Sequence, residues 1–94
     1  MTAARIHVSV SETTDGWIAD VTVSGERDTT HRVRVSHAEH ERFGGGDVAA
    51  LVTRSFEFLL AREPNTSILR EFDLGVIERY FPEYGEHIRG RAGP

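Results

Sequence analysis

Residues Ser55–Tyr84 read SFEFLLAREPNTSILREFDLGVIERYFPEY. This stretch holds four of the five phenylalanines, both tyrosines and two of the three prolines of the chain. Burial of large apolar side chains is the main force that stabilises a fold, so such a stretch supplies the surface on which the rest of a small domain packs. We therefore expect residues 55–84 to form the larger part of the core.

The first third of the chain has the pattern of a β-meander. In it, Ile6, Val8 and Val10 alternate with polar residues, a two-residue period that is typical of a strand with one buried face. The connections between the apolar segments are short turns, whereas parallel pairing would need a crossover of roughly a dozen or more residues. The sequence therefore predicts three antiparallel strands, at about residues 5–10, 17–23 and 30–35.

Two capping patterns mark where helices begin. Ser36 is followed three positions later by Glu39, which is the spacing of a capping box, and Asp47 stands directly before a long segment with helical periodicity. Pro64 ends that segment, because the residue before a proline is disfavoured in the helical conformation. The sequence predicts a short helix at about 37–43 and the main helix at about 48–62.

The remaining residues predict further short helices. Asp73 has the character of an N-cap, and Pro82 suits the first turn of a last helix. These helices are predicted at about 67–72, 74–81 and 83–88. The chain is therefore predicted to be one α+β domain over residues 1–94, with the helices on one sheet face and residues 89–94 as a disordered tail.

Composition restricts the classes of protein to which this chain can belong. With 94 residues it is predicted to form one domain with a modest core. It contains no cysteine, which excludes disulfides, thiolate metal sites and cysteine nucleophiles. No apolar run approaches the roughly 20 residues of a membrane span, and the first residues show no signal-peptide core. We expect a protein of the cytoplasm.

The C-terminal half of the chain resembles a group of known proteins. The phrases that carry this resemblance are SFEFLLAREP at 55–64, SILREF at 67–72 and IERYFPEY at 77–84. They are similar to phrases in small prokaryotic proteins of about this length that have no assigned function. The resemblance extends over residues 47–88 and, more loosely, over the strands ahead of them. It implies a compact autonomous domain and assigns no catalytic or binding residue.

His37 and His40 form the pattern that comes nearest to a metal site. They lie three positions apart on a predicted helix, and imidazoles one turn apart on a helix can converge on zinc. The histidines of the zinc-protease pattern, however, lie four apart, and Glu39 between them already fits the capping box. Solvated helix surface is therefore the preferred interpretation. A metal-dependent or acid–base enzyme that uses His37 and His40 is an alternative.

The polar face of the predicted sheet carries Arg5, Arg32 and Arg34. Arginines on an open sheet face can bind RNA or an acidic protein. That face has no aromatic residue for base stacking, it includes Asp20, and the chain carries a formal net charge of −4. Nucleic acid is therefore the less favoured partner, and a nucleic-acid-binding regulator is a further alternative.

The main helix has an apolar arc wider than one sheet face normally covers, because Phe56, Phe58 and Leu60 lie on both sides of its central stripe. Such an arc contacts either later helices or a second subunit. The sequence shows no convergent catalytic set and no cofactor or small-molecule motif. The preferred hypothesis is a non-enzymatic protein–protein interaction or regulatory module, acting as a homodimer or with another protein. Its candidate partner-binding residues are Arg5, Arg32, Arg34, Phe56, Phe58 and Leu60.

Overall fold

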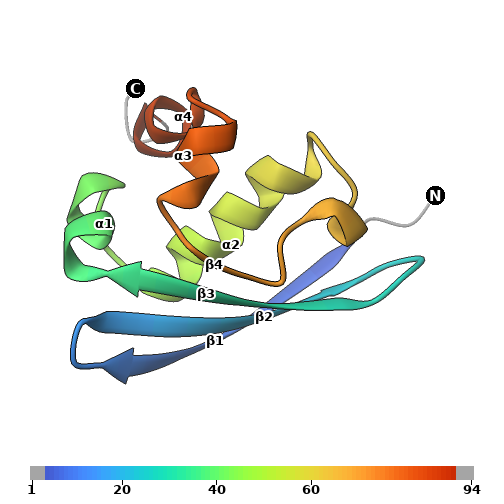
Figure 1. Cartoon of the computed structure of the whole chain (residues 1–94), viewed down its shortest axis with the longest axis horizontal. Coiled ribbons are helices and arrows are strands. Elements are labelled where there is room, and N and C mark those ends of the chain that lie inside the picture. The colour runs from blue at the N-terminus through green and yellow to red at the C-terminus, as the bar shows by residue number, and fades with distance from the viewer. Residues whose placement is uncertain (1–3, 91–94) are drawn as a thin grey trace.

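The sheet carries one strand more than the sequence predicts. In the computed structural model, which describes residues 4–90, four strands form one mixed sheet and the helices pack against it (Figure 1). The elements in chain order are β1 (Arg5–Thr13), β2 (Gly16–Ser24), β3 (Thr29–Ser36), α1 (His37–Arg42), α2 (Val48–Leu60), the 3₁₀ helix η1 (Asn65–Ser67), β4 (Glu71–Asp73), α3 (Val76–Tyr80) and α4 (Tyr84–Gly90). No helix in this described part of the chain is long and apolar enough to cross a membrane.

Strands β1, β2 and β3 form the predicted antiparallel meander, and each extends slightly beyond its predicted bounds. The residues of β1 and β2 pair one to one along their whole length, from Arg5 opposite Ser24 to Thr13 opposite Gly16. Inward-facing side chains such as that of Val33 are buried, whereas the outward-facing positions of β3 are polar. The predicted alternation is therefore confirmed.

Residues 67–72 do not form the predicted helix. Instead, η1 ends at Ser67, and the short strand β4 pairs in parallel with β3, where Phe72 lies opposite Val33. The three residues of β4 are exposed, buried and exposed in turn, so Phe72 enters the core. An alternation of three residues is too short to be recognised in a sequence, and its pairing partner lies far earlier in the chain.

Asp73 is not the helix cap that the sequence predicts. Its carboxylate accepts a hydrogen bond from Arg34 at 2.7 Å, and Glu71 accepts a second one from the same guanidinium at 2.7 Å. Helix α3 begins only at Val76, with Gly75 at the N-cap position and no side-chain cap. The pairing of these two acids with β3 therefore prevails over local capping.

The two other caps are as predicted. Ser36 and Glu39 form a capping box, with hydrogen bonds of 3.0 Å in both directions, and Asp47 accepts a hydrogen bond of 2.9 Å from the backbone N–H of Ala50. Glu39 also accepts a hydrogen bond of 2.9 Å from the backbone N–H of Gly75. One carboxylate therefore caps α1 and also ties it to the start of α3.

An aromatic cluster attaches α4 to the earlier helices. Tyr84 is fully buried, and its ring centroid lies 5.0 Å from that of Phe43 and 5.3 Å from that of Phe58. Its hydroxyl lies 2.6 Å from Oγ of Ser55, whose own hydroxyl donates to the carbonyl of Leu51 at 2.8 Å, so Tyr84 is the donor in this pair. Burial raises the pKa of Tyr84 to about 12.

Helix α4 extends further than the sequence predicts. It includes Arg89 and Gly90, which the sequence assigns to a disordered tail. Arg89 donates a hydrogen bond of 3.2 Å to the backbone carbonyl of Arg42, which connects the end of α4 to the end of α1. Residues 91–94 of the predicted tail lie outside the described residues.

Gly16 brings the end of the β1–β2 hairpin close to β3. Its φ is 153°, and a Cβ at this position would lie 2.1 Å from the carbonyl oxygen of Val35. We expect Gly16→Ala to lower the free energy of unfolding by about 2 kcal/mol or more, because the backbone of β3 has to move. Gly25→Ala, whose Cβ would meet nothing within 4 Å, should change it by less than about 0.5 kcal/mol. Equal urea midpoints for the two variants would contradict the close approach.

The raised pKa of Tyr84 predicts a loss of stability in alkali. The unfolded chain releases the phenolic proton near the ordinary pKa of 10.0, whereas the folded chain holds it up to about 12. This contribution is complete below pH 10 and is lost as the pH rises to about 12, by about 2–3 kcal/mol. Tyr84→Phe carries no such proton, so its free energy of unfolding should fall less than that of the wild type over this range. A difference between the two proteins that is independent of pH in denaturant titrations would show the prediction to be wrong.

Candidate functional site

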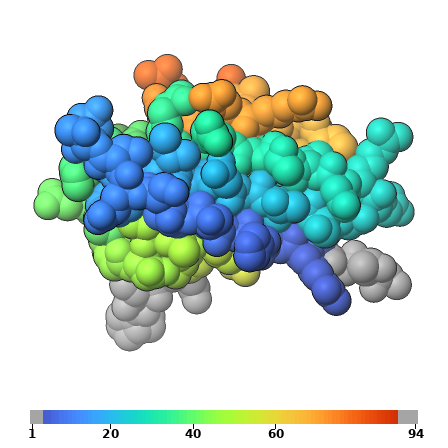
Figure 2. All heavy atoms as spheres, turned by 90° about the horizontal axis from the view of Figure 1, so that it is seen from below, coloured from blue at the N-terminus to red at the C-terminus, as the bar shows by residue number. Residues whose placement is uncertain are grey.

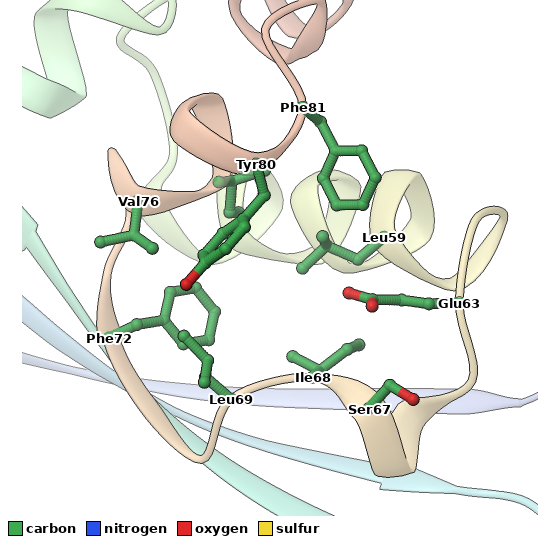
Figure 3. A pocket seen from close by; sticks show the side chains of 10 residues that line it. Leu59, Glu63, Ser67, Ile68, Leu69, Phe72, Val76, Tyr80 and Phe81 are labelled. Atoms are coloured by element: carbon green, nitrogen blue, oxygen red, sulfur yellow. The ribbon is translucent and has the colours of Figure 1, made fainter.

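An apolar hollow lies between the end of α2, the η1–β4 segment and α3 (Figure 3). Its volume is about 260 Å³. Its lining comes from three separate segments of the chain, so it exists only in the folded protein. We call it the apolar groove and define it by Leu59, Glu63, Ile68, Leu69, Phe72 and Tyr80.

Leu69 and Tyr80 bring exposed apolar surface to the groove. Leu69 is 48% exposed and Tyr80 is 68% exposed, and among residues 4–90 these two are the exposed large hydrophobic residues. Figure 3 shows the ring of Tyr80 directed across the groove towards Leu69 and Phe72. Single exposed apolar side chains are ordinary on a protein surface. These two differ from scattered ones because both line the same hollow.

Glu63 places a carboxylate at one end of the groove. The side chain is half-buried, and its carboxylate points into the groove beside Leu59 (Figure 3). All the other side chains that line the groove are uncharged. Within the part of the chain that the structure describes, Glu63 forms no ion pair. The groove therefore joins an apolar wall to an unpaired negative charge.

A chain of hydrogen bonds fixes the groove segment to β3. Asn65 Nδ2 donates to Thr29 Oγ1 at 3.0 Å, and Thr29 Oγ1 lies 2.8 Å from His31 Nε2. His31 Nδ1 lies 2.7 Å from the carbonyl oxygen of Leu69, which can only accept, so Nδ1 carries a proton. In the neutral imidazole, Nε2 then accepts the hydroxyl proton of Thr29. The backbone of Leu69 is thus held by a buried side chain of β3.

His31 positions the groove although the sequence assigns it no role. It is 4% exposed, and its ring centroid lies 5.2 Å from that of Phe56. The sequence gives one indication of this role. His31 occupies an inward position of β3, and the next inward residues of the strand are Val33 and Val35. A polar side chain at such a position needs a hydrogen-bond partner. The sequence cannot say that this partner is Leu69.

His37 and His40 pack against Trp17. Their ring centroids lie 4.9 and 4.7 Å from that of Trp17, and His40 Nε2 lies 2.6 Å from the carbonyl oxygen of Gly46. Among residues 4–90, no group of three or more histidine, aspartate or glutamate side chains is placed to hold a metal ion. The contacts of both imidazoles are therefore those of packing residues at the end of the sheet.

Arg32 and Arg34 are engaged with acids on the outer sheet face. Arg32 donates to Asp20 at 3.0 Å, and Arg34 donates to Asp73 and Glu71 as described above. The hydrogen bond and charge of Asp20 raise the pKa of Arg32, and those of Asp73, followed by those of Glu71, raise the pKa of Arg34. These two arginines face three carboxylates, so they do not form a basic patch.

The other predicted partner-binding residues are divided between core and surface. Phe56 and Phe58 are 0% and 3% exposed and belong to the core, so they are not available to a partner. Leu60 is half-buried and packs against the same core, whereas Arg5 is exposed at the start of β1. The wide apolar arc of α2 is thus covered largely by the chain itself, for example where Phe58 packs edge-on against Phe81 at 5.8 Å.

Comparison of this chain with models of known families, with curated proteins and with solved structures found no match. The surface of the chain itself, and chiefly the apolar groove, is therefore the evidence on its function.

The hydrogen bonds of His31 predict a local effect on the groove. His31→Leu should lower the free energy of unfolding by about 1–3 kcal/mol, because it leaves the Leu69 carbonyl and the Thr29 hydroxyl without their partner. It should also speed amide hydrogen exchange in residues 65–73 more than elsewhere in the chain. His7→Leu, on the exposed face of β1, serves as the matched control. Unchanged exchange in residues 65–73 would mean that His31 does not hold this segment.

Proposed function

We propose that this protein is a non-enzymatic interaction module of the cytoplasm that binds a peptide segment of another protein in the apolar groove. The observation that supports this function is the meeting of exposed Leu69, exposed Tyr80 and unpaired Glu63 at one hollow. The bound segment presents a large apolar side chain next to an arginine or lysine. The apolar side chain enters the groove as an anchor, as is common at peptide-binding surfaces.

The size of the groove favours a peptide side chain over a cofactor. Pockets that enclose small molecules usually measure roughly 300–1,000 Å³ and are lined by several polar groups that fix the ligand. This groove measures about 260 Å³, and its polar lining side chains are few: Glu63, Ser67 and Tyr80. It therefore suits one or two apolar side chains of a longer segment, whose remainder lies on the surface around Leu69 and Tyr80.

The charge of Glu63 gives the groove its selectivity. A guanidinium or ammonium group beside the apolar anchor would form a charge-assisted hydrogen bond with this carboxylate, which is stronger than a neutral one. An acidic segment would instead place a second negative charge next to Glu63, on a protein whose formal net charge is already −4. Repulsion of this kind excludes wrong partners as effectively as attraction selects the right one.

The alternative functions depend on side chains that are already engaged. A metal-dependent enzyme would need His37 and His40, which pack against Trp17. A nucleic-acid-binding regulator would need Arg32 and Arg34, whose guanidinium groups are bound by acids. Of these groups, His40 Nε2 already lies 2.6 Å from the carbonyl oxygen of Gly46 and both guanidinium groups are bound by acids, whereas the groove is open as it stands.

The peptide-binding function can be tested by selecting ligands from a display library of random peptides on the full chain. We expect enriched peptides to share one or two large apolar residues within a few positions of an arginine or lysine. Leu69→Arg and Tyr80→Ala should each weaken the binding of such a peptide by about tenfold or more, because anchors in a hollow contribute most of the affinity. Both side chains are exposed, so the fold should persist, which circular dichroism can verify.

Two variants serve as controls for this test. Thr14→Arg adds the same charge as Leu69→Arg at an exposed turn outside the groove and should bind normally. Glu63→Gln should weaken the selected peptide, yet leave unchanged the binding of a version whose basic residue is replaced by leucine. Peptides that bind Leu69→Arg and Tyr80→Ala as tightly as the wild type would place the binding site elsewhere. A library that yields no enriched peptide would refute the function.

A further inference from the structure

Strand β1 is a long open edge of the sheet. Its nine residues lie at one end of the strand order and, within residues 4–90, pair with β2 alone. Figure 2 shows the meander strands, in blue to teal, as a continuous band on which β1 lies uncovered. Natural proteins protect such edges with short strands, bulges, prolines or charged side chains. The nine residues of β1 include no proline, carry Arg5 and Glu12 only near the two ends of the strand, and pair with β2 without a bulge.

The opposite edge of the same sheet is protected. Strand β4 has three residues, two of which are acids bound by Arg34. A strand this short, with charges on its exposed positions, offers little to a further strand. The contrast between the two edges points to β1 as the edge that is free to pair.

The backbone groups that β1 presents follow from its turn. The hairpin closes through two residues, Thr14 and Asp15, so its last pair, Thr13 and Gly16, is a hydrogen-bonded pair. Hydrogen-bonded and non-bonded pairs alternate along an antiparallel ladder. The even-numbered residues of β1 therefore direct their N–H and C=O groups to the open edge. Three of these even-numbered residues, Ile6, Val8 and Val10, are apolar and half-buried.

The side chains of β1 are complementary to those of β1 in a second copy of the chain. When β1 pairs antiparallel with β1 of a second copy, one residue lies opposite its own copy, and the two-fold axis passes between the two. With the axis at Val8, Ile6 lies opposite Val10 of the second copy, and the two Val8 residues face each other. The half-buried apolar side chains of both copies would then cover one another, and about six backbone hydrogen bonds would form.

The charges on the outer face suit the same register. With the axis at Val8, Arg5 lies opposite Ser11 of the second copy, and His7 lies opposite Ser9. No like charges face each other, which would be destabilising in a cross-strand pair.

The neighbouring registers are worse. An axis at Ser9 would place the carboxylate of Glu12 opposite apolar Ile6. An axis at His7 would place two imidazoles opposite each other. The register with its axis at Val8 is therefore the one that matches both apolar and charged positions.

We propose that the protein forms a homodimer through β1, with a two-fold axis at Val8 that joins the two sheets into one sheet of eight strands. This inference stands on the edge strand and not on the function proposed for the groove. The groove contains Phe72 of β4, at the other edge of the sheet. Four strands set these edges roughly 14 Å apart, so dimerisation leaves both grooves open.

The test is the dimer dissociation constant of the full chain, measured by sedimentation equilibrium. Ser11→Arg sets an arginine opposite Arg5 of the second copy and should weaken the dimer roughly 2- to 30-fold, because the contact occurs twice. Ser11→Glu should strengthen it by a similar factor. Arg5→Glu combined with Ser11→Arg should restore it. These positions are exposed, so the fold is not at risk.

A control variant on β3 and a second variant of β1 complete the test. Thr30→Arg, on the exposed face of β3, should leave the dissociation constant unchanged. Val8→Pro removes an edge N–H without touching the pairing with β2 and should give a monomer. A wild-type chain that stays monomeric up to about millimolar concentration would overturn the proposal. A dimer whose dissociation constant is the same in both Ser11 variants as in the wild type would also overturn it. Selected groove peptides should still bind the Ser11→Arg protein, so failure of one proposal can be told from failure of the other.

Discussion

The parallel pairing of β4 with β3 is the interaction on which the rest of the structure depends. It returns the chain to the sheet after α2, with Phe72 opposite Val33 in the core and Arg34 bound to the acids on either side. Exposed ion pairs are screened by water and add little. The segment is held by burial of Phe72, by the hydrogen bond from His31 to Leu69, and by backbone hydrogen bonds such as that from the N–H of Leu74 to the carbonyl of Arg34 at 2.9 Å. Once β4 is fixed, the positions of η1 and α3 follow, and with them the walls of the groove.

The parts of the fold that the sequence predicts correctly are those that depend on neighbouring residues. The alternation of the meander, the capping box at Ser36 and Glu39, and the N-cap at Asp47 are all visible within a few positions. Strand β4 is different because its three residues are defined by cross-strand partners on β3 that are far away in the sequence. A capping signal at Asp73 predicts a helix there, but Phe72 is buried opposite Val33 and the carboxylate of Asp73 binds Arg34 instead.

The apolar groove could not be predicted from the sequence for the same reason. Ile68 and Leu69 are adjacent apolar residues, and a sequence gives both of them to the core. The extended backbone that leads into β4 turns them to opposite sides, so that Ile68 is 6% exposed and Leu69 is 48% exposed. Tyr80 likewise belongs to the stretch 55–84 that is expected to form the larger part of the core, yet it lies on the surface at the end of α3. Only the pairing of β4 with β3 determines which of these apolar residues are buried in the core and which are exposed.

The difference between the two edges of the sheet connects the proposed dimer with the proposed binding of a peptide in the groove. A groove of about 260 Å³ accepts few side chains, and a single site of this size binds weakly. Joining two copies through β1 would place their β4 edges roughly 34 Å apart on one continuous sheet. Two grooves held at a fixed distance bind a partner with two suitable segments far more tightly than one groove does, because the second contact is intramolecular. In the proposed dimer the open edge would compensate for the small groove, and the protected β4 would leave each sheet a single edge for pairing.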